Sequence, residues 1–492
     1  MHRLAFLALT ALLAVPSTAS AVDQTGVGEA VRHVLNVPHS EQRNPAQTQQ
    51  ATDFELTSIT PPGADTPHTY AFAGSYYDGL DVIDVTDPAT AHKVATYDCG
   101  IGQGDVQIFR RDGHVYIAYA QDDGYTQYTS RCVTDARELG YTPTSADGGT
   151  YIIDVTNPLD PQLVSFVSIG AGTNSLGFGL GSHNTTVHPG GRYIYNSNAD
   201  LMTDITPSIE IVDIGDLTSP KVVGEFALQT IPGLGTDAHD ITFSPDGNRA
   251  YVAALSHGEI LDTTDPAHPK LVSSVVDPTL NVWHQMEELS VDDPVLGERS
   301  FLIAEDEFAG AEGTAECPSG AVHVYDITNE QVPLPVGVFQ IDMAGVAPGN
   351  DTSTQYLARC TAHVFQIDRQ SKIMTMGWYN AGVRILDLNG LVGAAVGNTT
   401  VAGIKQLGWY RFDDSDTWAA KAVKADRKGY WLFGNDKRRG FDVYRYDPAP
   451  AGAVDPGRWL TPAQALREQQ AWRAKGGGRV SLVGLCFVHS QV

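Results

Sequence analysis

A short phrase rich in Val, Ile, Leu and Tyr recurs seven times along the chain, and six copies end in aspartate. The equivalent positions are Asp84, Asp154, Asp213, Asp262, Asp326, Asp387 and, in the degenerate seventh copy, Arg445. Consecutive copies lie between 49 and 70 residues apart. Recurrence on this scale indicates a repeat architecture, in which each unit buries its hydrophobic face against its neighbours.

Each repeat unit reads as four strands. The phrase itself, such as LDVIDVTDP at 80–88, combines residues that suit a buried pleated surface with an Asp-Pro turn that ends the strand. Another hydrophobic strand follows the turn. A β-hairpin with glycine in its turn precedes the phrase, as in residues 105–120, 184–198 and 240–255.

Seven such units predict an all-β fold, namely a seven-bladed β-propeller of four-stranded blades. The alternative is a series of separate β-sandwiches. A unit of about 60 residues buries too little surface to be stable alone. A closed ring solves this problem and protects the sheet edges, so we favour the propeller.

The two ends of the chain bear on how the ring closes. The seventh unit lacks an outer strand after Asp447, and we hypothesise that residues 22–40, through Glu29–Pro38, supply it. Thr461-Pro462 predicts the start of a short C-terminal helix, followed by a tail. The expected organisation is a signal peptide at 1–21, the propeller at 22–450, and a loop, helix and tail at 451–492.

The N-terminus has the features of a secretory signal peptide. Arg3 precedes an uncharged run at 4–15, and Ala19-Ser20-Ala21 offers a cleavage site of small residues. A membrane anchor is the alternative, but the run is too short to span a bilayer comfortably. We therefore expect a protein that is secreted to the extracellular space or the cell envelope, with a mature chain from Val22 and no transmembrane segment.

Net charge and cysteine content indicate which partners and which disulfides to expect. The formal net charge of −26 disfavours nucleic acid as a partner, because an acidic surface repels phosphates. We expect a monomer. An exported chain favours paired cysteines, with Cys99–Cys132 and Cys317–Cys360 preferred among three pairings and Cys486 left over.

The repeated phrase resembles the LVIVD repeat family. The residues GWYNAGVRILDL at Gly377–Leu388 carry the resemblance most clearly, and it extends from about residue 50 to residue 447. LVIVD proteins are seven-bladed propellers of mostly undetermined activity. The resemblance therefore implies the fold and export, and it implies little chemistry.

Four histidines fall in the same register of consecutive repeats. Each stands at the start of the first strand of its unit, in units 3 to 6: His183, His239, His284 and His363. First strands line the central channel of a propeller, so these rings are expected at one level of that channel.

Such a set is able to bind one transition-metal ion, with Fe, Cu and Zn as the candidates. Acids nearby are candidates to hold the outer ring nitrogens: Glu287, Glu288, Glu305 and Asp240. In outline the set is similar to the four-histidine iron site of carotenoid oxygenases, which is an analogy between folds. The alternative is a structural polar position that was duplicated with the repeat.

Three functions remain open, and the last of them is a hydrolase that uses an acid-rich channel. The first is a binding or scaffold protein outside the cell or at its surface, whose small-molecule, protein or cell-surface ligand the sequence does not identify. The second is a metal-dependent oxidoreductase with a four-histidine site in its channel. A hydrolase of the nucleophile-elbow type is not supported, because the chain contains no G-x-S-x-G motif.

Overall fold

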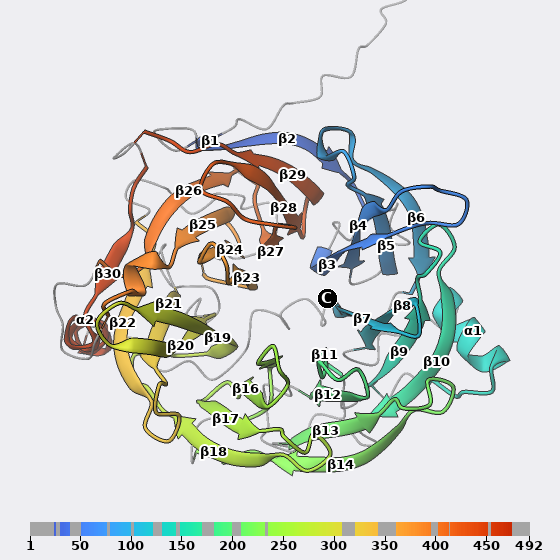
Figure 1. Ribbon diagram of the computed structural model, residues 1–492, viewed down its shortest axis with the longest axis horizontal. Helices are drawn as coiled ribbons and strands as arrows, with labels where there is room; N and C mark the ends of the chain where they lie inside the picture. Colours follow the sequence, from blue (N-terminus) through green and yellow to red (C-terminus); the bar gives the residue numbers. More distant parts are fainter. Residues whose placement is uncertain are drawn as a thin grey trace, which may run out of the picture.

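The computed structural model forms a ring of seven antiparallel sheets around a central channel (Figure 1). It describes residues 24–25, 30–39, 51–75, 79–99, 103–121, 130–143, 148–169, 182–198, 208–231, 235–307, 320–342, 361–394, 402–412, 414–450 and 454–474. The predicted signal peptide, Cys317, Cys360, Cys486 and the tail after residue 474 lie outside this part.

Every sheet is one blade, and in blades 1 to 4 the strands run in sequence order from the channel to the rim. Blade 1 comprises β3 (Ala51–Ile59), β4 (His68–Ser75), β5 (Gly79–Asp84) and β6 (His92–Asp98), and blade 2 comprises β7 (Gln103–Arg111), β8 (His114–Gln121), β9 (Gly148–Asp154) and β10 (Gln162–Ile169). Blade 3 comprises β11 (Asn184–Val187), β12 (Tyr193–Ser197), β13 (Ser208–Asp213) and β14 (Lys221–Ala227). Blade 4 comprises β15 (Asp240–Phe243), β16 (Arg249–Ala253), β17 (Gly258–Asp262) and β18 (Lys270–Val275).

Blades 5 to 7 contain strands from distant parts of the chain. Blade 5 comprises β19 (Trp283–Asp293), β20 (Gly297–Asp306), β21 (Ala321–Asp326), β22 (Leu334–Gln340) and β30 (Arg458–Leu460). Blade 6 comprises β23 (Phe365–Asp368), β24 (Ile373–Gly377), β25 (Val383–Asp387), β26 (Lys405–Arg411) and β1 (Gln24–Thr25). Blade 7 comprises β27 (Thr417–Lys421), β28 (Tyr430–Asp436), β29 (Gly440–Tyr446) and β2 (Val31–Val37). The predicted seven-bladed propeller is confirmed.

The repeated aspartate shapes the turn between the third and fourth strands. In blade 1 the carboxylate of Asp84 accepts a hydrogen bond from the backbone N–H of Thr86 at 2.9 Å. The same contact, to the N–H two residues later, recurs at Asp154, Asp213, Asp262, Asp326 and Asp387. This Asx-turn ends the strand and starts the connection to the rim. The repeated aspartate therefore serves to form this turn, and it lies away from the channel.

The hydrophobic core is divided into clusters that lie between neighbouring blades. One joins blades 1 and 2 through residues such as Tyr97 and Tyr119, and another joins blades 5 and 6 around Trp378. Equivalent clusters fill the remaining interfaces of the ring. Each blade is therefore stabilised by its two neighbours, as expected for a repeat protein.

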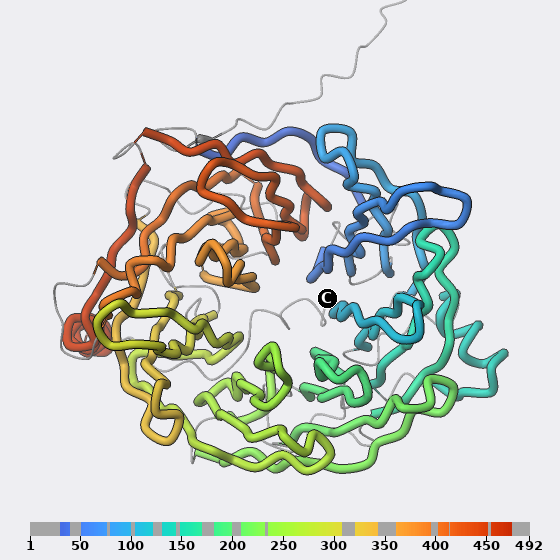
Figure 2. The backbone as a smooth tube through the Cα atoms, viewed as in Figure 1, coloured from blue at the N-terminus to red at the C-terminus, as the bar shows by residue number. Residues whose placement is uncertain are grey.

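The N-terminal segment closes the ring. Strand β2 pairs antiparallel with β29, so Val31 to Val37 form the outer strand of blade 7 (Figure 2). Just beyond this strand, the buried His39 bridges blades 1 and 7. Its Nδ1 lies 2.7 Å from Asp81 Oδ2 and its Nε2 lies 3.0 Å from Asn435 Oδ1. Residues 31–39 thus join the last blade to the first.

The C-terminal segment packs against blade 5. Strand β30 pairs with β22, and helix α2 (Pro462–Ala474) follows it. The predicted capping is present: the backbone N–H of Gln464 donates to Thr461 Oγ1, and Gln464 Oε1 accepts from the N–H of Thr461. The sequence did not predict β30, β1 or the short 3₁₀ helices η1 (Pro88–Thr90) and η3 (Asn389–Leu391).

Helix α1 (Arg131–Glu138) stands outside the ring beside blade 2 (Figure 1). A disulfide between Cys99 and Cys132 attaches it to the end of blade 1. This was one of the two preferred pairings, and the other involves residues outside the described part.

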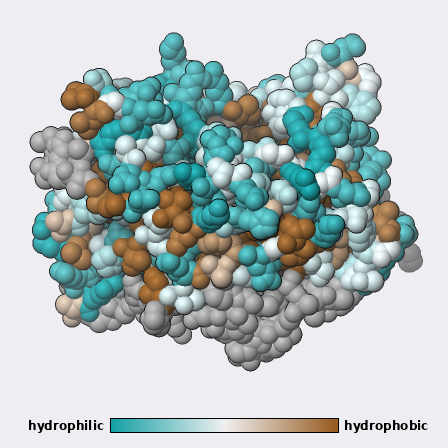
Figure 3. All heavy atoms as spheres, turned by 60° about the horizontal axis from the view of Figure 1, so that its bottom comes forward, coloured by the Kyte–Doolittle hydropathy of each residue, from teal (hydrophilic) through white to brown (hydrophobic). Residues whose placement is uncertain are grey.

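The outer surface of the ring is mainly hydrophilic in the side view of Figure 3, with hydrophobic side chains scattered across it. Among the described residues, no helix is long and apolar enough to span a membrane.

Candidate metal centre in the channel

The four histidines stand at the channel ends of four consecutive blades. His183 and His239 directly precede β11 and β15, His284 is the second residue of β19, and His363 precedes β23 by two residues. Their backbones are fixed in the same way in three blades. The N–H groups of His183, His239 and His363 donate to carbonyls of the neighbouring second-strand segment. All four side chains are buried.

The four imidazole rings form a contiguous row. Neighbouring ring centroids are 4.4 Å apart for His183 and His239, 4.1 Å for His239 and His284, and 4.3 Å for His284 and His363. The Nε2 atoms of His183 and His239 lie 3.0 Å apart. The register predicted from the repeats therefore corresponds to direct ring contact in the structure.

The outer nitrogens of three rings each face an oxygen. His239 Nδ1 donates to the carbonyl of His284 at 3.2 Å, and His363 Nδ1 donates to the carbonyl of Trp418 at 2.7 Å. His284 Nδ1 lies 2.6 Å from Glu305 Oε2. A carbonyl oxygen only accepts, so Nδ1 of His239 and of His363 carries the proton. In the neutral ring, Nε2 then presents its lone pair.

A carboxylate lies beside the inner nitrogens. Glu307 Oε2 is 3.7 Å from His284 Nε2, and Glu307 Oε1 is 3.7 Å from His363 Nε2. The hydroxyl of Tyr379 donates to Glu307 Oε1 at 2.6 Å. His239, His284 and Glu307 each offer a ligand atom, and these atoms lie within 4.8 Å of one another. The three residues are thus arranged so that they could hold a metal ion.

Burial keeps His239, His284 and His363 neutral. Desolvation, with a contribution from the neighbouring imidazoles, holds the pKa of His239 and of His363 well below the usual range. Burial also lowers the pKa of His284 to about 4, although Glu307 opposes the shift. Desolvation raises the pKa of Glu305 well above its usual range. Neutral imidazole is the form that binds a metal ion.

The four acids proposed from sequence have different places. Glu305 is next to His284, whereas Glu287 and Glu288 both bind Arg369, at 2.9 Å each. Asp240 lines the adjacent cavity. Burial raises the pKa of Glu287 to about 7, while Arg369 opposes the shift.

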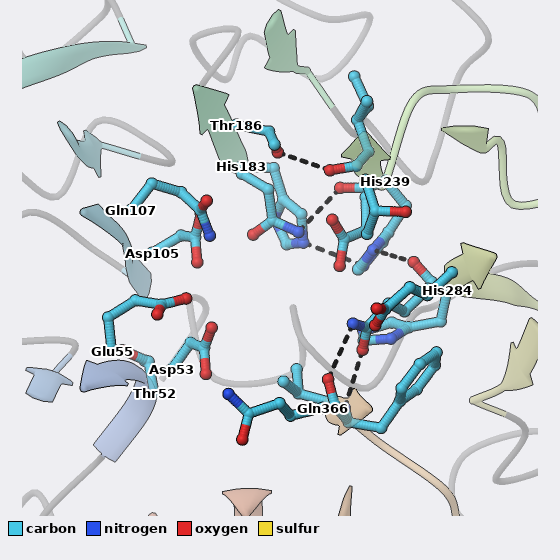
Figure 4. A pocket seen from close by; sticks show the side chains of 18 of the residues that line it. Thr52, Asp53, Glu55, Asp105, Gln107, His183, Thr186, His239, His284 and Gln366 are labelled. Atoms are coloured by element: carbon cyan, nitrogen blue, oxygen red, sulfur yellow. Dashed lines mark hydrogen bonds between the residues drawn. The ribbon is translucent and has the colours of Figure 1, made fainter. Parts of the chain in front are cut away.

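A cavity of about 300 Å³ opens onto the histidines, and all four contribute to its wall. Figure 4 shows Asp53, Glu55 and Asp105 facing His183, His239 and His284 across the open space. The carboxylate of Asp53 lies 2.7 Å from Lys421 Nζ, and that of Glu55 lies 3.3 Å from it. The cavity thus combines a histidine side with an acidic side.

Sequence reasoning missed Glu307, Tyr379 and the acidic residues Asp53 and Asp105. One signal was available for Glu307, because residues two apart on an extended segment share a face, and Glu305 had been singled out. Tyr379 reaches Glu307 from a loop of blade 6, where it adopts a positive φ of 32°. No spacing rule in the sequence indicates that contact.

The comparison with protein families agrees with the architecture. Residues 235–277, which span most of blade 4, match the model of the LVIVD repeat. The chain is a seven-bladed β-propeller that contains an LVIVD repeat. The matched segment includes His239, so one of the four channel histidines lies within a recognised repeat of the propeller.

Solved structures with similarity to this propeller share little sequence with it. A periplasmic gluconolactonase from Pseudomonas aeruginosa is 11% identical, with a TM-score of 0.48 over 84% of this chain and 99% of that one. A protein from Lactobacillus plantarum is 12% identical, with a TM-score of 0.45 over 84% and 99%. A putative 6-phosphogluconolactonase from Bacteroides uniformis is 10% identical, with a TM-score of 0.44 over 84% and 100%. No curated protein matches by sequence.

Proposed function

We propose that this protein is a metal-dependent oxidoreductase in which His183, His239, His284 and His363 bind one transition-metal ion. The observation that carries the proposal is the orientation of the rings. Backbone carbonyls accept from the outer nitrogens of His239 and His363, and a carboxylate oxygen of Glu305 lies 2.6 Å from the outer nitrogen of His284. The inner nitrogens of His284 and His363 each lie 3.7 Å from an oxygen of Glu307. Metal-ligating histidines are normally held in this way by a partner on the other ring nitrogen.

The spacing of the inner nitrogens suits a metal. An ion about 2.0–2.1 Å from each imidazole nitrogen requires neighbouring nitrogens roughly 3 Å apart. The Nε2 atoms of His183 and His239 are 3.0 Å apart. A set of imidazoles with one carboxylate nearby suits iron, copper or zinc. Iron and copper change their oxidation state readily and zinc does not, so electron transfer at the metal requires iron or copper.

Each residue of the centre has a distinct part in this proposal. Glu305 orients His284, and the two backbone carbonyls orient His239 and His363. Glu307 is placed to accept a proton or to act as a further ligand, and Tyr379 fixes its position. The cavity admits a small substrate directly to the histidines. A bound iron or copper ion would supply one-electron chemistry at this point.

Elemental analysis of the purified full-length protein tests the proposal. We expect near one equivalent of iron or copper, and its loss in His239→Ala and in His284→Ala. The matched control is His323→Gln, because His323 is buried in blade 5 outside the cluster. Protein free of metal after expression in metal-replete medium would contradict the proposed site. Stoichiometric zinc would retain the site but contradict redox chemistry at the metal itself.

We further propose that the protein works outside the cytoplasm. The signal-like N-terminus supports export, and the disulfide between Cys99 and Cys132 suits an oxidising compartment. A binding or scaffold role at the cell surface is the second candidate, because the propeller fold alone is sufficient for it. The metal-free outcome of the elemental analysis would favour that role.

A further inference from the structure

The geometry points to a protonated amine as the ligand class of the cavity, held by Asp53 and Asp105 opposite the histidines and by Asp240, the neighbour of His239 in the chain. This inference rests on the proposed function, because it names the substrate class of the same centre. A small organic cation would place its charge against the three carboxylates and its remaining part toward the four rings.

The acidic side is assembled from three blades. Asp53 lies on β3 of blade 1, Asp105 on β7 of blade 2 and Asp240 on β15 of blade 4. All three line the cavity, and Asp53 and Asp105 are each only 8% exposed. Strands that are far apart in sequence thus direct their acids toward one space. The aspartates that form the turns of the repeat do not account for this arrangement.

The carboxylates on this side outnumber the cations. Among the described residues that line the cavity, Lys421 is the only lysine or arginine, whereas five are acidic. Lys421 contacts Asp53 and Glu55, and Arg369 neutralises Glu287 from outside the lining. Asp105 and Asp240 add two further acids. The cavity is therefore selective against anions and suited to a cation.

One carboxylate oxygen has an unused hydrogen-bonding site. Asp53 Oδ2 binds Lys421, but Asp53 Oδ1 is buried and has no hydrogen-bond partner among the residues that the structure describes. Figure 4 shows the Asp53 side chain directed into the cavity. A buried acceptor without a partner costs free energy, and an ammonium N–H would satisfy it.

The charges on this side also repel one another. Burial and the neighbouring Asp53 raise the pKa of Asp105. A bound cation would relieve this repulsion, so the same arrangement that destabilises the empty cavity favours an ammonium group.

The rest of the cavity fits a compact apolar body. Val187, Phe243 and Phe365 belong to its lining, and its volume of about 300 Å³ is at the small end of ligand pockets. These properties favour a monoamine with one ring or a short chain.

Calorimetry with three compounds of similar shape tests the inference. The probes are benzylamine, which is protonated at pH 7.5, neutral benzyl alcohol and anionic benzoate, each titrated into the protein as purified. We expect benzylamine to bind at least ten-fold more tightly than benzyl alcohol, and benzoate not to bind. Charge-assisted hydrogen bonds account for a difference of this size. Equal binding of the three, or preference for benzoate, would overturn the inference.

Variants separate this inference from the metal proposal. Asp105→Asn should weaken benzylamine binding at least ten-fold and leave the metal content unchanged. His239→Ala should lose the metal and still bind benzylamine. Glu298→Gln changes the net charge equally at an exposed hairpin and should bind as the parent does. Loss of selectivity for the amine in Glu298→Gln, or undiminished binding in Asp105→Asn, would contradict the acidic side as the site.

Discussion

At the scale of single residues, the protonation of each channel histidine depends on the atom opposite its outer nitrogen. For His239 and His363 this atom is a backbone carbonyl, which fixes the tautomer without any titratable group. His284 instead faces Glu305, whose carboxyl group is buried and has a raised pKa. Of the three contacts, the contact of His284 is therefore the one that a side-chain substitution can change.

Glu305→Gln tests this positioning role. The amide retains the size of the side chain but weakens its interaction with Nδ1 of His284, so metal affinity should fall about ten- to 100-fold. Competition with a chelator measures this change. Glu288→Gln is the control, since Glu288 binds Arg369 and does not contact the rings. Equal affinity in Glu305→Gln and the parent would mean that Glu305 does not orient the ligand.

Distance along a strand explains which acids the sequence could identify. Residues rise about 3.3 Å each along a strand, so Glu287 and Glu288 are carried away from His284 and reach Arg369. Glu305 lies on the adjacent strand β20, at the same level as the histidine. The histidine register was readable because each ring repeats at one position of the blade. A contact between two blades, such as that of Tyr379 with Glu307, does not recur from repeat to repeat, so the repeats do not reveal it.

The acidic side of the cavity should make stability depend on pH. The pKa of Asp105 is raised in the folded state to about 7, above its value of 3.8 in a model compound. Its contribution to stability is therefore complete below about pH 4 and is lost as the pH rises toward 7. Asp53, Glu55 and Asp240 face the same space, with Lys421 as their cation.

Asp105→Asn should remove the loss of folding stability that accompanies the rise in pH. The amide oxygen can still accept the hydrogen bond from Thr185, so the variant should gain stability relative to the parent between pH 4.5 and pH 8. Urea denaturation at both pH values measures the difference. A difference between variant and parent that stays the same at the two pH values would show that Asp105 ionises normally.

At the scale of elements, local rules predicted the blades and missed the additions to them. The Asp-Pro turns and the alternating hairpins are local signals, and each blade follows them. Strands β1 and β30 have two and three residues and lie on the outer edges of blades 6 and 5. Such short strands depend on the edge that they join, so the sequence of the segment alone does not indicate them.

Strand β2 has the largest expected effect among the terminal elements. Deleting residues 22–40 removes the outer strand of blade 7 and the His39 bridge to blade 1, so the thermal midpoint should fall sharply. Differential scanning calorimetry measures it. Deleting only residues 22–27, which removes the two-residue pairing of β1 with β26, should have a small effect. Similar midpoints for the longer deletion and the parent would mean that the ring is closed without β2.

At the scale of the whole molecule, the ring gathers side chains that no single blade could bring together. The hydrophobic cores between blades repeat around the ring, but the residues that line the channel do not repeat. The histidines come from blades 3 to 6, and the acids Asp53, Asp105 and Asp240 come from blades 1, 2 and 4. The fold followed from the repeats. The cavity follows from the positions at which the repeats differ, which is why the sequence predicted the four histidines but, of the three acids, only Asp240.

The most direct test of the account is X-ray absorption spectroscopy of the protein as purified, at the edge of the metal that it contains. The account predicts a first shell dominated by nitrogen at about 2.0–2.1 Å, with the outer-shell scattering of several imidazole rings. It also predicts that this scattering disappears in His239→Ala. A first shell without imidazole scattering, or a protein that contains no metal, would contradict the four-histidine centre.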